Sequence, residues 1–182
     1  MREKAAKPLL WLGMVSMAMI FAGLTSAYVV RQGKGDWLVF DLPQLFYVST
    51  AVIMLSSVTM NWVLSSAKKN NFKNIKLASL ITLILGLVFI VCQFKAWGAL
   101  VDQKVFFAGK YSNAAGSYLY ILTVLHVVHM FGGILSVSTV WVKSLSQKYN
   151  SENLLGIKLC AIFWHFLDAL WIFLFLFLLF VR

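Results

Sequence analysis

The chain has 182 residues, of which 61% are hydrophobic and 12% are charged, and its mean hydropathy is +0.84. This composition excludes a soluble domain and is typical of an integral membrane protein. The formal net charge is +10, but the Lys and Arg residues lie mostly in loops between apolar runs. Such a distribution indicates membrane topology rather than nucleic-acid binding. We therefore expect a single membrane domain over residues 1–182 and no nucleic-acid partner.

Five apolar segments are long enough to cross about 30 Å of hydrocarbon. In chain order they are residues 9–30, 43–66, 75–98, 117–142 and 157–181. Small side chains recur in the first segment (Ala18, Ala22, Gly23, Ser26, Ala27) and in the fourth (Gly132, Gly133). In lipid, small residues allow helices to approach closely, so we expect helix packing at these positions. The sequence thus predicts an all-α integral membrane bundle of five transmembrane helices.

The basic residues predict the orientation of the spans. One side of the predicted topology holds ten of them: Arg2, Lys4, Lys7, Lys68, Lys69, Lys73, Lys76, Lys143, Lys148 and Lys158. The other side holds six: Arg31, Lys34, Lys95, Lys104, Lys110 and Arg182. Because cytoplasmic loops carry an excess of Lys and Arg, we expect a cytoplasmic N-terminus and a C-terminus on the outer side.

The last two spans contain three histidines and one aspartate: His126, His129, His165 and Asp168. An aspartate near the middle of a bilayer costs roughly 2.5–3.5 kcal/mol, so it is expected to face protein or water. His126 and His129 are three residues apart, as are His165 and Asp168, and each pair therefore shares a helix face. Gly133 continues the face of His126 at i+7.

These four residues admit several interpretations. Three imidazoles and a carboxylate would suit a metal such as zinc, copper or iron. Histidines could also hold a haem, although two of them at i and i+3 on one face cannot ligate the same iron from opposite sides. A proton relay is a further possibility, because intramembrane ionisable groups often mark proton pathways. The favoured hypothesis is a structural polar cluster of inter-helix hydrogen bonds that fixes the register of the helices.

The last span contains Trp164, Asp168 and Trp171 on an i, i+4, i+7 stripe, within the segment WHFLDALWIFLF at residues 164–175. This segment resembles the terminal-helix signature W-H-F-x-D-x-x-W-[LI]-F-L of subunit III of haem–copper oxidases. The segment HVVHMFGG at residues 126–133 resembles the H-x-x-H-x-x-x-G pattern of the same family. Further similar stretches lie at residues 21–28, 93–97 and 116–123, so the resemblance covers nearly the whole chain in order.

The resemblance implies the five-helix bacterial form of a non-catalytic oxidase subunit, located in the cytoplasmic membrane with the C-terminus in the periplasm. In that family, subunit III carries no redox metal, and the haems and copper lie in subunits I and II. Subunit I would be the main partner, and subunits II and IV and a larger respiratory supercomplex are further candidates. The resemblance also implies bound phospholipid between two groups of helices, with helices 1 and 2 in one group and helices 3 to 5 in the other.

On this basis we expect a core subunit of an aa3-type cytochrome c oxidase, which reduces oxygen and translocates protons, with no catalytic, cofactor or metal residue on this chain. His126, His129, His165 and Asp168 would hold the helices together, and Gly132, Gly133, Trp164 and Trp171 would pack them. Two family glutamates are replaced, one by Met17 and one by Lys158, so the roles of those carboxylates do not transfer to this chain.

Three alternatives remain open. Subunit III of a quinol oxidase is similar to the cytochrome c version, and this chain alone does not separate them. A stand-alone haem- or metal-binding membrane protein would show its cofactor in an absorption spectrum. A transporter is expected to have helices broken by Gly or Pro, whereas the two prolines here, Pro8 and Pro43, lie near the ends of the predicted spans.

Overall fold

The computed structural model describes residues 2–35, 37–109, 112–145 and 154–181. They form five long helices: α1 (Arg2–Gln32), α2 (Gln44–Lys68), α3 (Phe72–Asp102), α4 (Ala114–Leu145) and α5 (Leu155–Phe180). Each helix is long and apolar enough to cross a membrane, and the described ranges contain no strand. The expected all-α fold with five membrane-spanning helices is therefore confirmed. Each helix also extends beyond its predicted span at one end or both.

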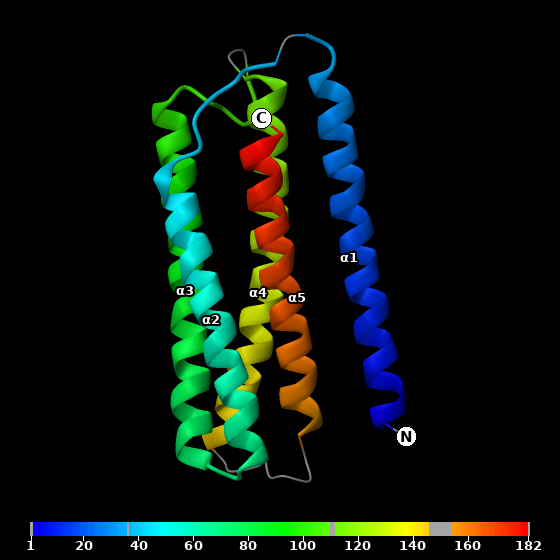
Figure 1. Ribbon diagram of the computed structural model, residues 1–182, viewed down its shortest axis with the longest axis vertical. Coiled ribbons are helices and arrows are strands. Elements are labelled where there is room, and N and C mark those ends of the chain that lie inside the picture. The colour runs from blue at the N-terminus through cyan, green and yellow to red at the C-terminus, as the bar shows by residue number, and fades with distance from the viewer. Residues whose placement is uncertain (1, 36, 110–111, 146–153, 182) are drawn as a thin grey trace.

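The helices do not divide into the two groups that we expected. Helices α2 to α5 form one four-helix bundle, and the most extensive contact within it is between α2 and α3. Within the described ranges, α1 contacts α4 and α5 but neither α2 nor α3, and Figure 1 shows it standing at one side of the bundle. The prediction that helices 1 and 2 form a separate group is therefore wrong. The connection from α1 to α2 crosses one end of the molecule (Figure 1), so neighbours in sequence are not neighbours in space.

The pairing of α2 with α3 follows from a tight turn between them. Asn70 adopts a left-handed backbone conformation with φ of 53°, which asparagine tolerates better than most residues. The side chain of Asn71 then caps α3 by accepting a hydrogen bond from the backbone N–H of Asn74 at 3.2 Å. This short connection makes α2 and α3 antiparallel neighbours, and the hydroxyls of Thr59 and Thr82 hydrogen-bond between them at 2.8 Å.

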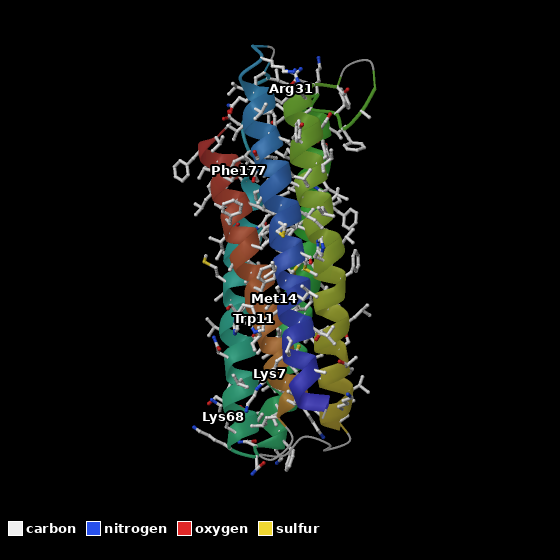
Figure 2. All side chains as sticks on the ribbon, turned by 90° about the vertical axis from the view of Figure 1, so that its right-hand side faces the viewer. Lys7, Trp11, Met14, Arg31, Lys68 and Phe177 are labelled. Atoms are coloured by element: carbon white, nitrogen blue, oxygen red, sulfur yellow. The ribbon has the colours of Figure 1, made fainter. Side chains whose placement is uncertain are left out.

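Helix α1 contacts the bundle through a stripe of side chains seven residues apart. Met14, Phe21 and Tyr28 are all buried, whereas most other residues of this helix are exposed. The ring of Phe21 lies 5.7 Å from that of His129 on α4, and the ring of Tyr28 lies 5.1 Å from that of Phe177 on α5. Figure 2 shows α1 in front of α4 and α5, with Met14 part-way along it.

Candidate functional site

The side chain of Trp164 reaches from α5 into the centre of the four-helix bundle. It is completely buried, and its indole nitrogen donates a hydrogen bond to the Ser56 hydroxyl of α2 at 3.0 Å. Its ring lies against two glycines: a Cβ atom at Gly86 of α3 would be 2.8 Å from the indole carbon Cη2, and one at Gly133 of α4 would be 3.3 Å from Cε3. Trp164 therefore touches all three other helices of the bundle.

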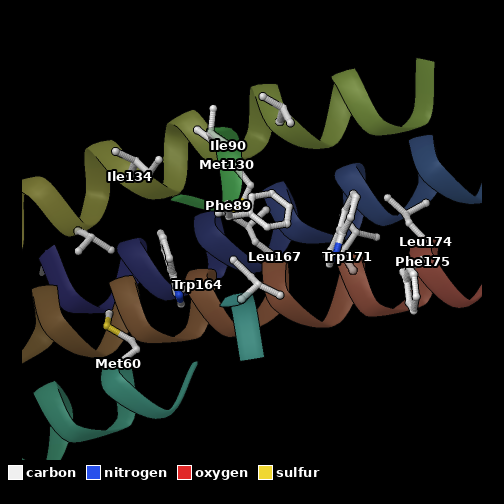
Figure 3. Close-up of a cluster of buried hydrophobic side chains, with 14 of the residues drawn as sticks. Met60, Phe89, Ile90, Met130, Ile134, Trp164, Leu167, Trp171, Leu174 and Phe175 are labelled. Carbon is white, nitrogen blue, oxygen red and sulfur yellow. The ribbon is translucent and has the colours of Figure 1, made fainter. Parts of the chain in front are cut away.

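Trp171, two turns further along α5, makes the same kind of contact with α2. Its indole nitrogen donates to the Thr50 hydroxyl at 3.0 Å. Its ring stacks on Phe46 at a centroid distance of 6.0 Å and meets Phe89 of α3 edge-on at 4.9 Å. Figure 3 shows Trp164 and Trp171 projecting from α5 into the same apolar core, with Leu167 between them. Each buried indole N–H is thus satisfied by a hydroxyl of α2, as burial requires.

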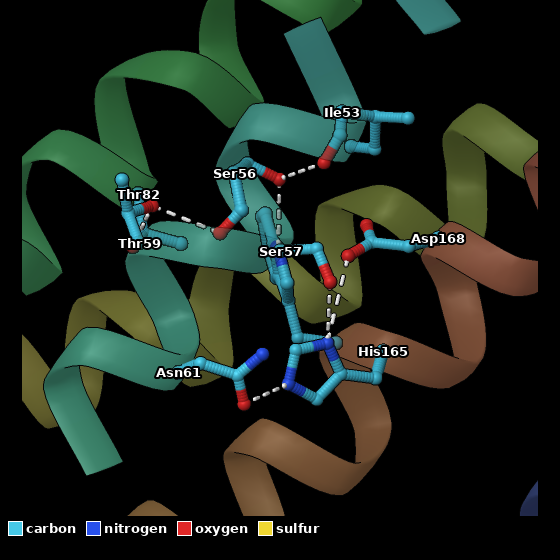
Figure 4. Close-up of polar contacts among 9 residues, drawn as sticks. Ile53, Ser56, Ser57, Thr59, Asn61, Thr82, His165 and Asp168 are labelled. Atoms are coloured by element: carbon cyan, nitrogen blue, oxygen red, sulfur yellow. Dashed lines mark hydrogen bonds and ion pairs between the residues drawn. The ribbon is translucent and has the colours of Figure 1, made fainter. Parts of the chain in front are cut away.

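His165 lies at the outer edge of the contact between α5 and α2. Its Nδ1 atom is 2.7 Å from the Ser57 hydroxyl and its Nε2 atom is 3.2 Å from Oδ1 of Asn61, as Figure 4 shows. The imidazole is about one-third exposed. His165 thus links α5 to two positions of α2 that are one helical turn apart, which fixes the relative register of the two helices.

Asp168 lies one turn after His165 and is almost completely buried. Neither carboxyl oxygen has a hydrogen-bond partner among the described residues, and Oδ2 is 3.9 Å from Nδ1 of His165. That separation is within the range of an ion pair but too long for a hydrogen bond. Asp168 is therefore adjacent to the link between α2 and α5 without forming one of its hydrogen bonds.

The histidines of α4 lie elsewhere. The ring of His126 is completely buried between aromatic rings, 5.1 Å from that of Trp171 and 5.9 Å from that of Phe89, and neither of its nitrogens has a partner among the described residues. His129 bonds through Nδ1 to the backbone oxygen of Leu125 in its own helix at 2.7 Å. The four ionisable side chains are thus distributed over two regions instead of forming one hydrogen-bonded cluster.

The two glycines singled out in α4 differ in their surroundings. A Cβ atom at Gly133 would be 2.8 Å from Leu167 of α5, so the absence of a side chain allows the close approach of α4 and α5. A Cβ atom at Gly132 would be 3.9 Å from its nearest neighbour, a ring carbon of Phe163, which is an ordinary contact distance. In the part of the chain that the structure describes, no three His, Cys, Asp or Glu residues are grouped so that they could hold a metal ion.

The hydroxyl groups of α2 belong to the site but were not predicted from the sequence. Ser49 accepts a hydrogen bond from the buried Gln93 of α3 at 3.0 Å, and Thr50, Ser56 and Ser57 contact the side chains of α5 described above. These hydroxyls recur as two pairs, 49–50 and 56–57, seven residues apart. Trp164 and Trp171 of α5 are also seven residues apart. A seven-residue spacing on both helices is typical of helices that pack along each other, so it could have indicated that α2 and α5 are neighbours.

The sequence matches the family model described as "Cytochrome c oxidase subunit III" over residues 38–181. The chain belongs to the cytochrome c oxidase subunit III family. The resemblance inferred from residues 126–133 and 164–175 is thereby confirmed. Membership makes the chain a multi-pass membrane subunit of a haem–copper oxidase, which associates with other oxidase subunits.

Individual relatives carry two kinds of name. The "Probable cytochrome c oxidase subunit 3" of Nocardia farcinica is 30% identical over 180 residues, covering 96% of this chain and 86% of the relative. The "Cytochrome c oxidase subunit 3" of Bacillus sp. (strain PS3) is 25% identical over 170 residues, covering 91% and 80%. The "Cytochrome bo(3) ubiquinol oxidase subunit 3" of Buchnera aphidicola is also 25% identical, over 173 residues that cover 92% and 89%.

Proposed function

We propose that the chain is a non-catalytic core subunit of an aa3-type cytochrome c oxidase in the bacterial cytoplasmic membrane, and that it stabilises subunit I. The match to the subunit III family over residues 38–181 carries this proposal. The relatives named cytochrome c oxidase subunit 3 in Nocardia and Bacillus support the choice of electron donor. The haem and copper centres of the complex would then lie in subunits I and II.

The contacts of the intramembrane histidines support a structural role. His165 bonds to Ser57 and Asn61 of the neighbouring helix, and His129 bonds to a carbonyl of its own helix. His126 is enclosed by aromatic rings from three other helices, namely Phe21, Phe89 and Trp171. The contacts of His165 and His126 hold helices together, and hydrogen bonds between helices contribute about 0.6 kcal/mol each on average in a membrane.

The test is purification of the complex through a tag on this chain. We expect subunits I and II to co-purify, and we expect the complex to consume oxygen with reduced cytochrome c. Absence of oxidase subunits from the purified material would overturn the proposal. A haem or copper ion ligated by His126 or His129 would overturn the non-catalytic role.

Subunit III of a quinol oxidase is the second candidate, because the relative from Buchnera is named as part of a ubiquinol oxidase. The two candidates differ in the electron donor and in the copper-site motif of the partner subunit II. Oxygen consumption with a quinol but not with reduced cytochrome c, together with a subunit II that lacks the copper ligands, would favour this second candidate.

We further propose that a phospholipid acyl chain occupies a groove between α1 and α5. The groove has a volume of about 510 Å³ and is lined by Ala18, Ala22 and Ser26 of α1 and by Phe173 and Phe177 of α5, among others. The small residues of α1 therefore leave a groove between α1 and α5 instead of allowing a close helix contact.

Substitutions on α1 test this lipid site. We expect Ala22→Phe to reduce the phospholipid retained per purified complex, measured by mass spectrometry, whereas Val15→Phe on the exposed part of α1 leaves it unchanged. Equal retention in both variants would contradict the groove as a lipid site.

The orientation is also a proposal, with the N-terminus in the cytoplasm. Figure 2 shows Lys7 and Lys68 toward one end of the bundle and Arg31 at the other. The excess of basic residues at the first end supports its cytoplasmic location. Reporter fusions that are active only in the cytoplasm or only outside it, placed at each terminus, would test this. A cytoplasmic signal from the C-terminal fusion would contradict it.

A further inference from the structure

The outer face of α2 carries a stripe of four exposed side chains, which we call the α2 stripe: Met54, Val58, Asn61 and Ser65. They are separated by four, three and four residues. This is the spacing of the seam along which one helix packs on another in left-handed bundles. Two of the four are polar, although the stripe lies within a predicted membrane span.

Asn61 is the polar residue of this stripe that lies deepest. It is five residues from the middle of α2 (Gln44–Lys68), which corresponds to about 7.5 Å along the helix. The hydrocarbon extends about 15 Å from the centre of a bilayer, so Asn61 is well inside it. Lipid tails offer neither donors nor acceptors, and each unsatisfied polar group there is costly.

Among the described residues, only one end of the Asn61 amide has a hydrogen-bond partner. Its Oδ1 atom is bonded to Nε2 of His165, and its other amide atom makes no hydrogen bond to any residue that the structure describes. The conclusion holds for either orientation of the amide, because the two terminal atoms exchange roles when the group is flipped. His165 is itself partly exposed beside it. An amide that His165 already orients therefore has hydrogen-bonding capacity left at the surface.

The outer faces of α3 and α4 are different. The exposed mid-span residues of α3 are apolar (Ile84, Leu87, Val88, Val91, Phe94), and the exposed Lys95 that follows them has a chain long enough to extend its charge toward the interface. Those of α4 are also apolar (Ile121, Val124, Val128, Phe131, Leu135), and the exposed Thr139 satisfies its hydroxyl on the backbone oxygen of Ser136 in the same helix at 2.7 Å. Lipid can cover such faces without loss of hydrogen bonds, whereas it cannot satisfy Asn61.

We infer that the α2 stripe docks a transmembrane helix of another oxidase subunit, and that this helix places a Ser or Thr hydroxyl or an Asn or Gln amide opposite Asn61. Hydroxyl and amide groups both donate and accept, so they satisfy the amide in either orientation. The inference rests on the proposed function for the identity of the complex. It adds the face of this chain that meets the partner and the chemistry of the contact.

Photo-crosslinking in the intact complex tests the surface. A benzophenone amino acid replaces Val58, which is 66% exposed and forms none of the hydrogen bonds described above. The control replaces Leu135 of α4, which is 67% exposed. We expect Val58 to crosslink to another oxidase polypeptide and Leu135 to give no such product. Crosslinking of Val58 only to lipid, or only to a second copy of this chain, would overturn the inference and leave the proposed function intact.

Substitutions test the hydrogen bond. We expect Asn61→Leu to lower the fraction of this chain retained on the complex after detergent washing by about threefold, the effect of one average hydrogen bond in a membrane. Ser57→Ala removes the other hydrogen bond of His165 without changing the exposed amide, and we expect full retention. Equal losses in the two variants would overturn the inference, because they would place the effect inside the chain. Failure of the unaltered chain to co-purify with oxidase subunits would instead overturn the proposed function, on which the inference rests.

Discussion

Trp164 of α5 lies so close to Gly86 of α3 that a Cβ atom at position 86 would be 2.8 Å from the indole carbon Cη2. The indole has little room to move, because it is completely buried and its nitrogen is bonded to Ser56 at 3.0 Å. This contact between a glycine and a tryptophan sets the distance between α3 and α5 in the core.

Gly86→Ala should therefore destabilise the subunit. Overpacking a well-packed core costs about 1–3 kcal/mol, and we expect a lower thermal transition of this chain in the purified complex. Gly98→Ala on the same helix is the matched control, because a Cβ atom there would meet nothing within 4 Å. A transition temperature for Gly86→Ala equal to that of Gly98→Ala would contradict the packing of Trp164 against α3.

A second pair of glycines tests the approach of α4 to α5. Gly133→Ala would bring a methyl group to 2.8 Å from Leu167 and 3.3 Å from Trp164, whereas Gly132→Ala would leave 3.9 Å to Phe163. We expect only Gly133→Ala to lower the thermal transition, because only there must buried neighbours shift. The thermal transition temperatures of the two variants are measured in parallel, and a larger decrease for Gly132→Ala than for Gly133→Ala would contradict this prediction.

The hydrogen bond from Trp171 to Thr50 can be measured by a double-mutant cycle. Thr50→Val leaves the buried indole N–H without an acceptor, while Trp171→Phe removes that N–H altogether. We expect the double variant to lose less stability than the sum of the single variants, by about 0.6 kcal/mol. Strict additivity in unfolding measurements would show that the 3.0 Å contact contributes nothing to the stability of the subunit.

Asp168→Asn should leave the subunit as stable as before or make it more stable. The carboxyl group is buried and has no hydrogen-bond partner among the described residues, and its distance to His165 is 3.9 Å. An ionised carboxylate that is buried without a hydrogen-bond partner is costly, and an amide of the same shape removes that charge. His165 keeps its bonds to Ser57 and Asn61 in this variant. A loss of more than about 2 kcal/mol would show instead that a paired charge had been broken.

Hydropathy predicted the number and position of the helices, because the length of an apolar run is a local property of the sequence. It did not predict which helices pack together. The pairing of α2 with α5 depends on Thr50 and Ser56 meeting Trp171 and Trp164, which are more than a hundred residues away in the chain. Adjacency in sequence suggested that the first two helices form a group, whereas the tight turn at Asn70 joins α2 to α3.

The candidate site was predicted in part. The spacing of His165 and Asp168 placed both on one face of α5, and the structure puts this face against α2. Spacing alone could not show that Asn61 bonds His165, because Asn61 is one of several polar residues of α2 and nothing in the sequence distinguishes it as the partner. Nor could it separate His126 from His129, which share a helix face but differ in their neighbours.

The buried stripe of Met14, Phe21 and Tyr28 lies on α1, which among the described helices contacts α4 and α5 and no other. During translation, the ribosome completes α1 before α4 and α5 have been made. The earliest segment to enter the bilayer must therefore wait for the latest two before it gains its native neighbours within the chain, whereas α2 and α3 can pair as soon as their turn emerges. Helix α1 consequently meets its first native neighbour only when α4 has been made, and lipid or another protein must cover its buried stripe in the interval.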